Sequence, residues 1–377
     1  MKAFPSDRLH ESVAHWLYDP NVVGLDMRHK VTGGRVTREW AICVQVLEKK
    51  PTSALAVGEL HIPPTVETLT VDPGTSAFRT YTPTDVIEVE PPTLCNGYLG
   101  WHARPAWGGL GIGIRSHDRT QWIDGTMTVA NWGGVRRIFS AGHCLNTQRS
   151  DTGFVVKEKM EPSKPIFQPG RELELHPPGK WSSRRMKIGL VENSYPLFIY
   201  PVGDKGPFYF NTYDVAWAIP KSGATSYAIG PEGLSTIWPQ PSQSVRITDI
   251  STIPQQADLE TYKGSAYGLR VGFVGVRTGI HEGLVKNTYA LMKVIADVQQ
   301  NFYCFRDLVR VELNSGGLPD HGDSGSMLVG LGSKMGTGLG ILCSVSANAA
   351  YFSRIPTANP GGALLQQPKH DPGPPPP

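Results

Sequence analysis

Short apolar and β-branched runs, broken by glycine and proline, fill most of this chain. Such runs are typical of the strands of a barrel or a sandwich. They lie at residues 109–114, 127–129, 137–139, 187–191, 244–247 and 338–345. Apolar residues recur at helical spacing over residues 6–18, whereas the pattern over 287–297 is ambiguous between helix and strand. The pattern therefore predicts a mainly β protein.

The N-terminal part of the chain has a different pattern. A short amphipathic helix is expected over residues 6–18, followed by β-branched strands over 36–46 and 84–89. We therefore expect a small α+β module at residues 1–90. Prolines and glycines over residues 91–108 indicate a linker to the region that follows.

The rest of the chain divides into a long β-rich region, residues 109–357, and a short tail. Two stretches inside the region, 146–186 and 220–243, are rich in Pro, Gly and Ser, and we expect them to form surface loops. The tail, residues 358–377, closes on four prolines and cannot build a core. We expect it to be disordered.

Charge and hydropathy exclude some classes of partner. The 377 residues carry a formal net charge of only +3, too small to indicate binding to nucleic acid or a membrane surface. No apolar run approaches the roughly 20 residues that cross a bilayer. Residues 1–11 lack the apolar core of a signal peptide. We therefore expect a cytoplasmic protein without nucleic-acid or membrane partners.

The cysteines agree with a reducing compartment. Their number is odd, they are widely spaced, and no CxxC pair occurs among them. They are Cys43, Cys95, Cys144, Cys304 and Cys343. We expect five reduced thiols, with a disulfide as the alternative.

Two motifs that lie far apart carry the candidate chemistry. Residues 140–144 (Ser-Ala-Gly-His-Cys) contain His143, and residues 322–326 (Gly-Asp-Ser-Gly-Ser) contain Ser324. A serine hydroxyl becomes a useful nucleophile when an imidazole takes its proton and a carboxylate orients that imidazole. Asp214, which opens an apolar run between the motifs, is the candidate carboxylate. Taken singly, each motif also fits a plain turn, a structural or metal-binding histidine, or a strand edge.

The chain order His143, Asp214, Ser324 is the one found in chymotrypsin. Together the motifs resemble those of trypsin-like (chymotrypsin-fold) serine peptidases, over about 245 residues. The resemblance implies two six-stranded antiparallel β-barrels, with His143 and Asp214 on the first and Ser324 on the second. It also implies an oxyanion hole made by the backbone amides of Gly322 and Ser324, and no metal or organic cofactor.

The resemblance also nominates residues of a substrate pocket. Leu318 stands six residues before the nucleophile, the position that usually lies at the pocket base, which favours an uncharged P1 residue. Ser344 and Val345 end the strand that resembles the pocket wall. Ser344 or Cys343 is alternatively placed to reach the carboxylate of Asp214, and the sequence leaves that choice open.

The chain departs from secreted trypsin relatives at three places. They pair the cysteine after the histidine with one about sixteen residues earlier, and Cys144 has no such partner. Their zymogens are switched on when a new N-terminus pairs with the aspartate before the nucleophile, here Asp323, but no matching cleavage site precedes the first barrel. A buried, unpaired carboxylate is costly, so we expect a partner from among Arg136, Arg137 and His321, or control by the N-terminal module.

The N-terminal module is the third difference from secreted trypsin relatives. Its residues 22–90 resemble a module that precedes trypsin-like domains in some non-secreted bacterial and plant peptidases. The main hypothesis is therefore an intracellular serine endopeptidase that acts on a protein or peptide through a covalent acyl-enzyme. A regulatory partner of the N-terminal module fits this hypothesis. The alternatives are a catalytically silent binding or scaffold protein on the same fold, and an esterase that uses the same triad.

Overall fold

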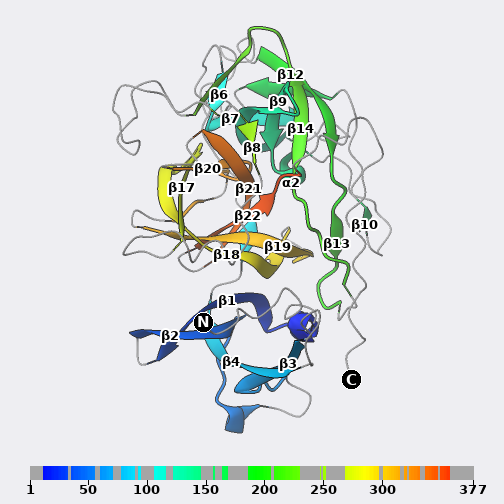
Figure 1. Cartoon of the computed structure of the whole chain (residues 1–377). Coiled ribbons are helices and arrows are strands. Elements are labelled where there is room, and N and C mark those ends of the chain that lie inside the picture. The colour runs from blue at the N-terminus through cyan, green and yellow to red at the C-terminus, as the bar shows by residue number, and fades with distance from the viewer. Residues whose placement is uncertain are drawn as a thin grey trace.

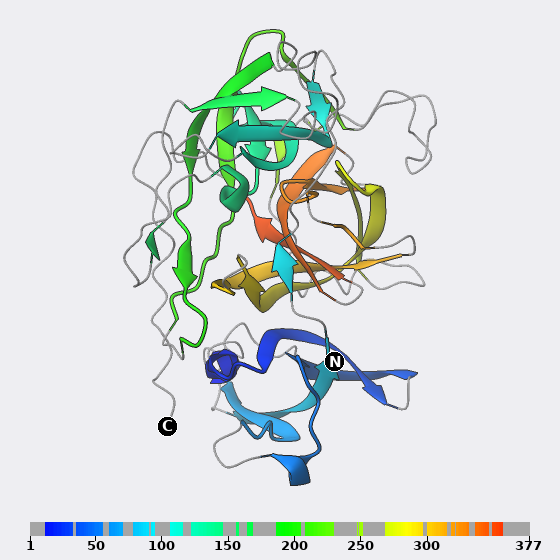
Figure 2. The same cartoon turned by 180° about the vertical axis from the view of Figure 1, so that it is seen from behind.

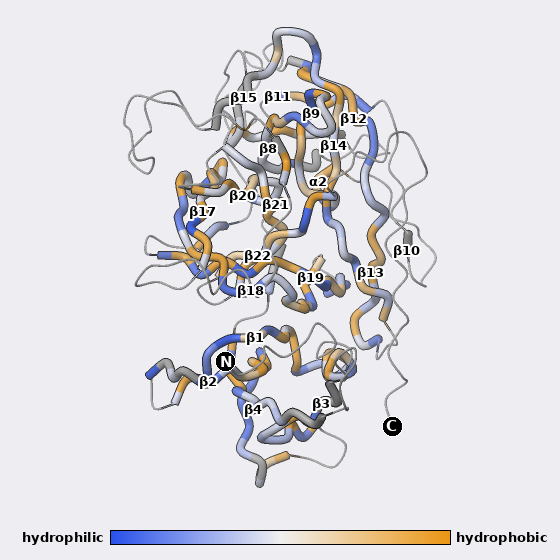
Figure 3. Tube along the Cα trace, viewed as in Figure 1, coloured by the Kyte–Doolittle hydropathy of each residue, from blue (hydrophilic) through white to orange (hydrophobic). Residues whose placement is uncertain are grey.

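Three groups of strands make up the computed structural model, as Figure 1 shows: two barrels and an N-terminal sheet. The structure describes residues 12–32, 35–55, 60–70, 78–89, 92–94, 106–115, 122–145, 156–157, 164–168, 186–204, 208–229, 247, 249–251, 268–296, 300–314, 318–320, 322–331, 336–346 and 349–356. Figure 3 shows hydrophobic residues concentrated along many of the barrel strands. The expectation of a mainly β protein is confirmed.

The first barrel is a closed ring of antiparallel strands in the upper part of Figure 1. In ring order its strands are β7 (Leu110–Arg115), β8 (Trp122–Trp132), β9 (Val135–Ser140), β14 (Ala216–Pro220), β12 (Met186–Ser194) and β11 (Pro165–Gln168). Aliphatic side chains that alternate along the strands, including Ile112, Ile138 and Ile188, are fully buried inside it. Burial of this face fixes the register of each strand.

A second ring repeats the same strand order. Its strands are β17 (Leu269–Gly275), β18 (Gly279–Ile295), β19 (Phe302–Leu313), β22 (Ala349–Arg354), β21 (Thr337–Ser346) and β20 (Met327–Gly330), and β20 pairs with β17 to close it. Every pairing around the ring is antiparallel. Counted along the chain, the strands of each ring follow the order 1-2-3-6-5-4. The predicted double barrel is therefore confirmed by the strand pairing.

The N-terminal sheet continues the sheet of the second barrel. Its elements are η1 (Ala14–Tyr18), β1 (Val22–Thr32), β2 (Arg35–Val46), η2 (Thr52–Ala54), β3 (Thr65–Thr70) and β4 (Phe78–Glu88). Strand β1 pairs with β18, with Gly24 opposite Met292 and Leu25 opposite Leu291. Figures 1 and 2 both place this sheet against β18. Of the predicted helix at 6–18, the described part is mainly the 3-10 helix η1, which buries Trp16.

Buried polar contacts join the N-terminal sheet to the second barrel. Asp26 Oδ2 lies 3.2 Å from Arg310 Nε, and both side chains are almost completely buried. The side chain of Gln45 donates through Nε2 to the Tyr351 hydroxyl at 2.9 Å, and its Oε1 accepts from the Ser346 hydroxyl at 3.3 Å. Because a buried charge is costly without a partner, these contacts hold the sheet in one register on the barrel.

The remaining elements are short. They are β5 (Thr93–Leu94), β6 (Ala106–Gly108), α2 (Gly142–Leu145), β10 (Val156–Lys157), β13 (Phe198–Tyr200), β15 (Thr225–Ile229) and β16 (Asp249–Ile250). Strands β5 and β6 fall within the predicted linker.

The expectation of surface loops at 146–186 and 220–243 is corrected, because these stretches include the strands β11 and β15. The stretch 287–297, which the sequence left open between helix and strand, belongs largely to the strand β18. A four-residue strand that begins at Pro165 is too short for its periodicity to distinguish it from a loop. The tail at 358–377 lies outside the described residues, as does the strand expected at 244–247 except for Ile247.

The described cysteines are free. Cys43, Cys144, Cys304 and Cys343 are all buried and form no disulfide with one another, and Cys95 lies outside the described residues. No helix in the described part of the chain is long and apolar enough to cross a membrane.

Candidate active site

Strand pairing in the first barrel brings His143 to Asp214. Strands β9 and β14 are antiparallel, with Ser140 opposite Ala216. His143 follows the end of β9 by three residues, in the short helix α2, and Asp214 precedes β14 by two. The His143 ring Nδ1 lies 2.7 Å from Asp214 Oδ2, and the His143 backbone N–H donates to Asp214 Oδ1 at 2.9 Å. Both carboxylate oxygens therefore hold the histidine.

The environment of this pair stabilises a protonated imidazole. Asp214 is fully buried, and its backbone N–H donates to the Ser353 hydroxyl at 2.7 Å. Burial by itself lowers the pKa of His143, but the negative charge of Asp214, with a contribution from Cys144, outweighs burial. The pKa of His143 therefore lies well above its ordinary value of 6.5. A proton taken up by this ring is held by the buried carboxylate.

Ser324 lies against the segment that carries His143. Its carbonyl oxygen accepts from the Thr126 backbone N–H at 2.7 Å and lies 4.0 Å from Cys144 Sγ, one residue beyond the histidine. Ser324 Oγ and His143 Nε2 are both buried, and neither has a hydrogen-bond partner among the described residues. Hydrogen bonds between a nucleophile and its base are often long in the absence of substrate and tighten when substrate binds.

The turn around Ser324 leaves two amides available. Gly322 has φ 112°, a left-handed conformation that glycine adopts readily. Within the described residues, the amides of Gly322 and Ser324 donate to no acceptor, whereas Asp323 N–H donates to the Asp320 carbonyl at 3.0 Å and Gly325 N–H to the Leu342 carbonyl at 3.0 Å. The two free amides are those expected to form an oxyanion hole.

Asp323 is fully buried, and the arginines nominated for it pair elsewhere. Arg137 forms an ion pair with Glu192, and Arg136 donates to the Thr225 carbonyl. The nomination of these two arginines is therefore wrong. His321 lies outside the described residues.

The residues nominated for the pocket lie in different environments. Leu318 is 42% exposed, Ser344 is fully buried on β21, and Val345 is half-buried. The Ser344 hydroxyl has no hydrogen-bond partner within the described residues, so it does not hold Asp214 there. Ser353 on β22 contacts Asp214 instead. Sequence reasoning missed Ser353 because nothing distinguishes it from any polar residue on a strand.

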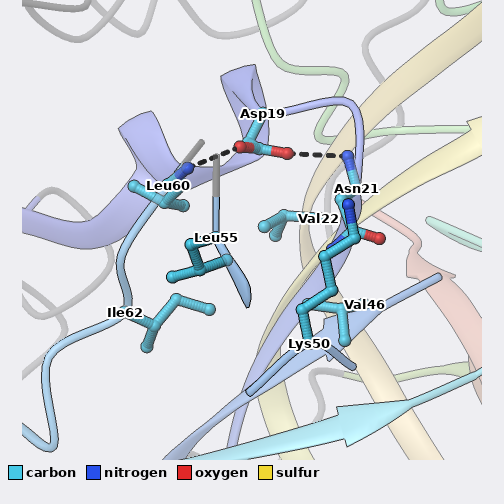
Figure 4. A pocket seen from close by; sticks show the side chains of 8 residues that line it. All are labelled: Asp19, Asn21, Val22, Val46, Lys50, Leu55, Leu60 and Ile62. Carbon is cyan, nitrogen blue, oxygen red and sulfur yellow. Dashed lines mark hydrogen bonds between the residues drawn. The ribbon is translucent and has the colours of Figure 1, made fainter. Parts of the chain in front are cut away.

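A small cavity lies away from these residues, in the N-terminal region (Figure 4). Its volume is about 40 Å³, which is room for a few water molecules. Asp19 at its edge accepts from the backbone N–H groups of Asn21 and Leu60. It is too small for a peptide or a cofactor. Among the described residues, no cluster of three or more His, Cys, Asp or Glu side chains is arranged to hold a metal ion.

Comparison with known proteins gives distant structural likeness only. No family model matches the sequence, and no curated protein matches it either. Crystal structures of a chymotrypsin from Cellulomonas bogoriensis and of Protease A from Thermobifida fusca are 16% and 14% identical. Each likeness covers 66% of this chain, and 91% and 90% of the other chain, with TM-scores of 0.33 and 0.35. The description of two barrels therefore rests on the strand pairing within this chain and not on these likenesses.

Proposed function

We propose that this protein is a serine endopeptidase with Ser324 as nucleophile, His143 as general base and Asp214 as the group that orients the base. The observation that carries the proposal is the buried pair of His143 and Asp214, 2.7 Å apart, beside a serine turn with two free amides. A carboxylate on Nδ1 fixes the tautomer in which Nε2 accepts a proton, and this is what a serine nucleophile requires.

In the proposed reaction, Ser324 Oγ attacks the scissile carbonyl carbon while His143 Nε2 takes its proton. Asp214 stabilises the imidazolium, which agrees with the raised pKa of His143. The amides of Gly322 and Ser324 donate to the oxyanion of the tetrahedral intermediate. His143 then gives its proton to the leaving amine, and the acyl group stays on Ser324 as an ester. Water, deprotonated by His143, hydrolyses this ester and frees Ser324.

The proposal extends to the setting of the enzyme. It has a protein or peptide substrate with an uncharged P1 residue, needs no cofactor, acts in the cytoplasm, and has neither nucleic acid nor a membrane as partner. Residues 1–90 form its N-terminal module and 109–357 its peptidase domain, with Leu318, Ser344 and Val345 near the substrate.

A silent binding protein is the second candidate, and one observation favours it. Ser324 Oγ and His143 Nε2 are not hydrogen-bonded to each other. Against it, none of the three triad residues is replaced. An esterase would use the same groups.

A fluorophosphonate probe separates these candidates. Covalent labelling of the wild type, lost in Ser324→Ala, is expected of a peptidase or an esterase. A Ser326→Ala control removes a neighbouring hydroxyl that donates to backbone carbonyls, and it should still be labelled. An unlabelled wild type would contradict the proposal. Digestion of a proteome-derived peptide mixture then identifies a peptidase, whereas an esterase leaves the peptides intact.

A further inference from the structure

Among the described residues, the donors that bind the carboxylate of Asp323 carry no charge. Asp323 Oδ1 accepts from the Arg277 backbone N–H at 2.8 Å and lies 3.4 Å from the Thr278 backbone nitrogen. Asp323 Oδ2 accepts from the Thr278 hydroxyl and from the Asp320 backbone N–H, the latter at 3.0 Å. The Arg277 side chain lies 3.3 Å from the exposed carboxylate of Asp320 instead. Several such donors offset part of the cost of burying a carboxylate away from water.

Most of these donors belong to one tight turn, Gly275–Gly279, which we call the anchor turn. It joins β17 to β18, and Gly275 pairs with Gly279 across its base. A side chain at position 275 would overlap the carboxylate of Asp323, so glycine is required there for Asp323 to reach the turn. The anchor turn and the carboxylate therefore fit each other closely.

Thr126 ties the anchor turn to the residue before Asp323. Its hydroxyl donates to the Gly322 carbonyl at 2.7 Å and accepts from the Val276 backbone N–H at 3.3 Å. The two residues that precede Ser324 are thus both held by the anchor turn, Asp323 directly and Gly322 through Thr126. Their placement determines where the amides of Gly322 and Ser324 point.

We propose that the anchor turn takes the place of the newly cleaved N-terminus of a trypsin zymogen, with Thr278 as a positioning residue. The inference rests on the proposed function, because it concerns the amides assigned to the oxyanion. The full-length chain is then competent without N-terminal processing, since the donors of Asp323 come from an internal turn.

Thr278→Val tests this role, because valine keeps the shape of threonine and removes the hydroxyl. We expect kcat to fall by about tenfold or more with KM unchanged, since loss of a whole oxyanion donor costs on the order of 100-fold to 1000-fold. Thr278→Ser should restore kcat. Thr225→Val is the matched control, because Thr225 is a buried threonine whose hydroxyl has no partner in the described part of the chain. Equal kcat values in Thr278→Val and Thr225→Val would overturn the proposal.

Two further measurements do not depend on turnover by the variants. In a Ser324→Ala background, Thr278→Val should speed hydrogen exchange of the peptide spanning residues 318–326, and Thr278→Ser should not. Unchanged hydrogen exchange would overturn the role proposed for the anchor turn, even if the protein proves inactive. A wild type that the fluorophosphonate probe does not label would contradict only the proposed function. The intact mass of the fluorophosphonate adduct should equal the mass of residues 1–377 plus that of the phosphonyl group left by the probe. Labelling confined to N-terminally shortened protein would contradict the inference.

A different observation concerns the edge of β21 next to the nucleophile. Leu342 on β21 exchanges backbone hydrogen bonds with the serine turn, accepting from Gly325 and donating to Ser326. Two and three residues further along, Ser344 and Val345 pair antiparallel with β5. Because β22 covers the other edge of β21, β5 lies on the edge that faces the serine turn. Strand β5 therefore lies on the same edge as the serine turn, farther along β21, and its Thr93 also pairs with Ile295 of β18.

Extended peptides bind proteins by adding a strand to an open sheet edge. Under the proposed function, the acyl side of a peptide substrate would occupy this edge of β21. We infer that β5 is an internal occupant of the edge, which must leave before substrate binds. Such an occupant reduces the apparent affinity for substrate to the intrinsic affinity multiplied by the fraction of molecules in which the edge is free. This contact is an autoinhibitory one, and it is independent of the anchor turn.

Peptide binding to an inactive background tests this contact. The three substitutions Pro92→Gly, Thr93→Ser and Leu94→Gly are combined in the Ser324→Ala protein. This protein should bind a fluorescent peptide with the wild-type sequence of residues 88–94 several-fold more tightly than Ser324→Ala alone does. A control with Val202→Gly, Gly203→Ser and Asp204→Gly alters an exposed turn and should leave the affinity unchanged. Equal affinity with and without the β5 changes would overturn the inference. In the active enzyme, the same changes should lower KM several-fold without altering kcat.

Discussion

The second barrel contacts the first barrel through a shared buried hydrophobic cluster and separate hydrogen bonds around the serine turn, whereas a backbone ladder and a buried ion pair join it to the N-terminal sheet. At the barrel contact, Thr126 bonds to both Ser324 and Gly322. At the sheet contact, β1 pairs with β18, and Asp26 lies 3.2 Å from Arg310. Under the proposed function, the hydrogen bonds of the first contact align groups for a reaction, whereas the ladder and ion pair of the second contact hold the sheet on the barrel.

This difference predicts that damage at the two contacts has different consequences. Changes at the barrel contact should reduce activity at nearly constant stability. Changes at the sheet contact should reduce stability while kcat of the folded protein stays nearly constant.

Ser324→Ala should give the largest effect. We expect kcat to fall by about a million-fold, because triad residues act as a unit, while the melting temperature stays close to that of the wild type. Hydrolysis of a sensitive peptide substrate, followed with thermal unfolding, measures both. Turnover at the wild-type rate would show that another group is the nucleophile.

Asp214→Asn should lower kcat by roughly 10⁴-fold, because an amide favours the wrong imidazole tautomer. The pH profile of kcat/KM supplies a second readout. His143 must be neutral to act as base, so with its raised pKa the wild-type rate declines on the acid side from a midpoint above 6.5. Without the Asp214 charge, burial dominates and the midpoint should move to lower pH. An unmoved midpoint would mean that another group sets the pKa of His143.

The raised pKa of His143 also makes the folding stability depend on pH in a defined direction. Because the pKa of His143 is raised in the folded state, its pairing with Asp214 stabilises the fold fully below the ordinary pKa of histidine. That contribution is lost as the pH rises through the raised value. Asp214→Asn should therefore destabilise the protein more at pH 6 than at high pH, as measured by chemical unfolding.

Asp26→Ala should affect the sheet contact alone. It leaves Arg310 buried without its carboxylate, and breaking a buried ion pair costs about 3–5 kcal/mol of unfolding free energy. Chemical denaturation measures this loss, and kcat of the remaining folded protein should stay near the wild-type value. Combining Asp26→Ala with Arg310→Met removes both charges and should recover much of the stability. A large loss of kcat in Asp26→Ala would show that the two contacts are coupled.

Thr126→Val should produce the converse result. The hydroxyl bonds to Gly322 and Val276 would be lost, so kcat should fall by about tenfold, within the range for impaired oxyanion stabilisation. The melting temperature should change little compared with that of Asp26→Ala. Thr126→Ser keeps the hydroxyl and serves as the control. Loss of stability without loss of kcat would reverse the assignment of the two contacts.

Short β-rich runs in the sequence predicted strands, such as parts of β8 and β21, whereas the two barrels were predicted from the resemblance to trypsin-like peptidases. The sequence pattern missed β11, a four-residue strand beginning at Pro165, because so short a run resembles a loop. His143, Asp214 and Ser324 were nominated because each lies in a recognisable motif.

Thr126, Thr278 and Ser353 lie in no motif, and their roles depend on contacts between residues far apart in the chain. The arginines proposed for Asp323 were wrong for a related reason. Charge complementarity suggested a cation, but a tight turn can supply enough backbone donors to hold a carboxylate. Only the folded chain shows which of the two is present.

Cysteine reactivity gives the smallest expected effect and distinguishes the two contacts by position. Cys43 lies opposite Asp26 in the β1–β2 pairing, and Cys144 lies beside Ser324. Burial, with the nearby Asp26 charge, holds the pKa of the Cys43 thiol well above its ordinary value, so in the native protein it should react slowly with a thiol reagent. Asp26→Ala loosens the sheet contact and should speed labelling of Cys43 several-fold, while labelling of Cys144 stays unchanged, as read by peptide mass spectrometry. In denatured, unreduced protein all five cysteines should titrate, and three or fewer would indicate disulfides. Equal acceleration of Cys43 and Cys144 would mean that the two contacts open together.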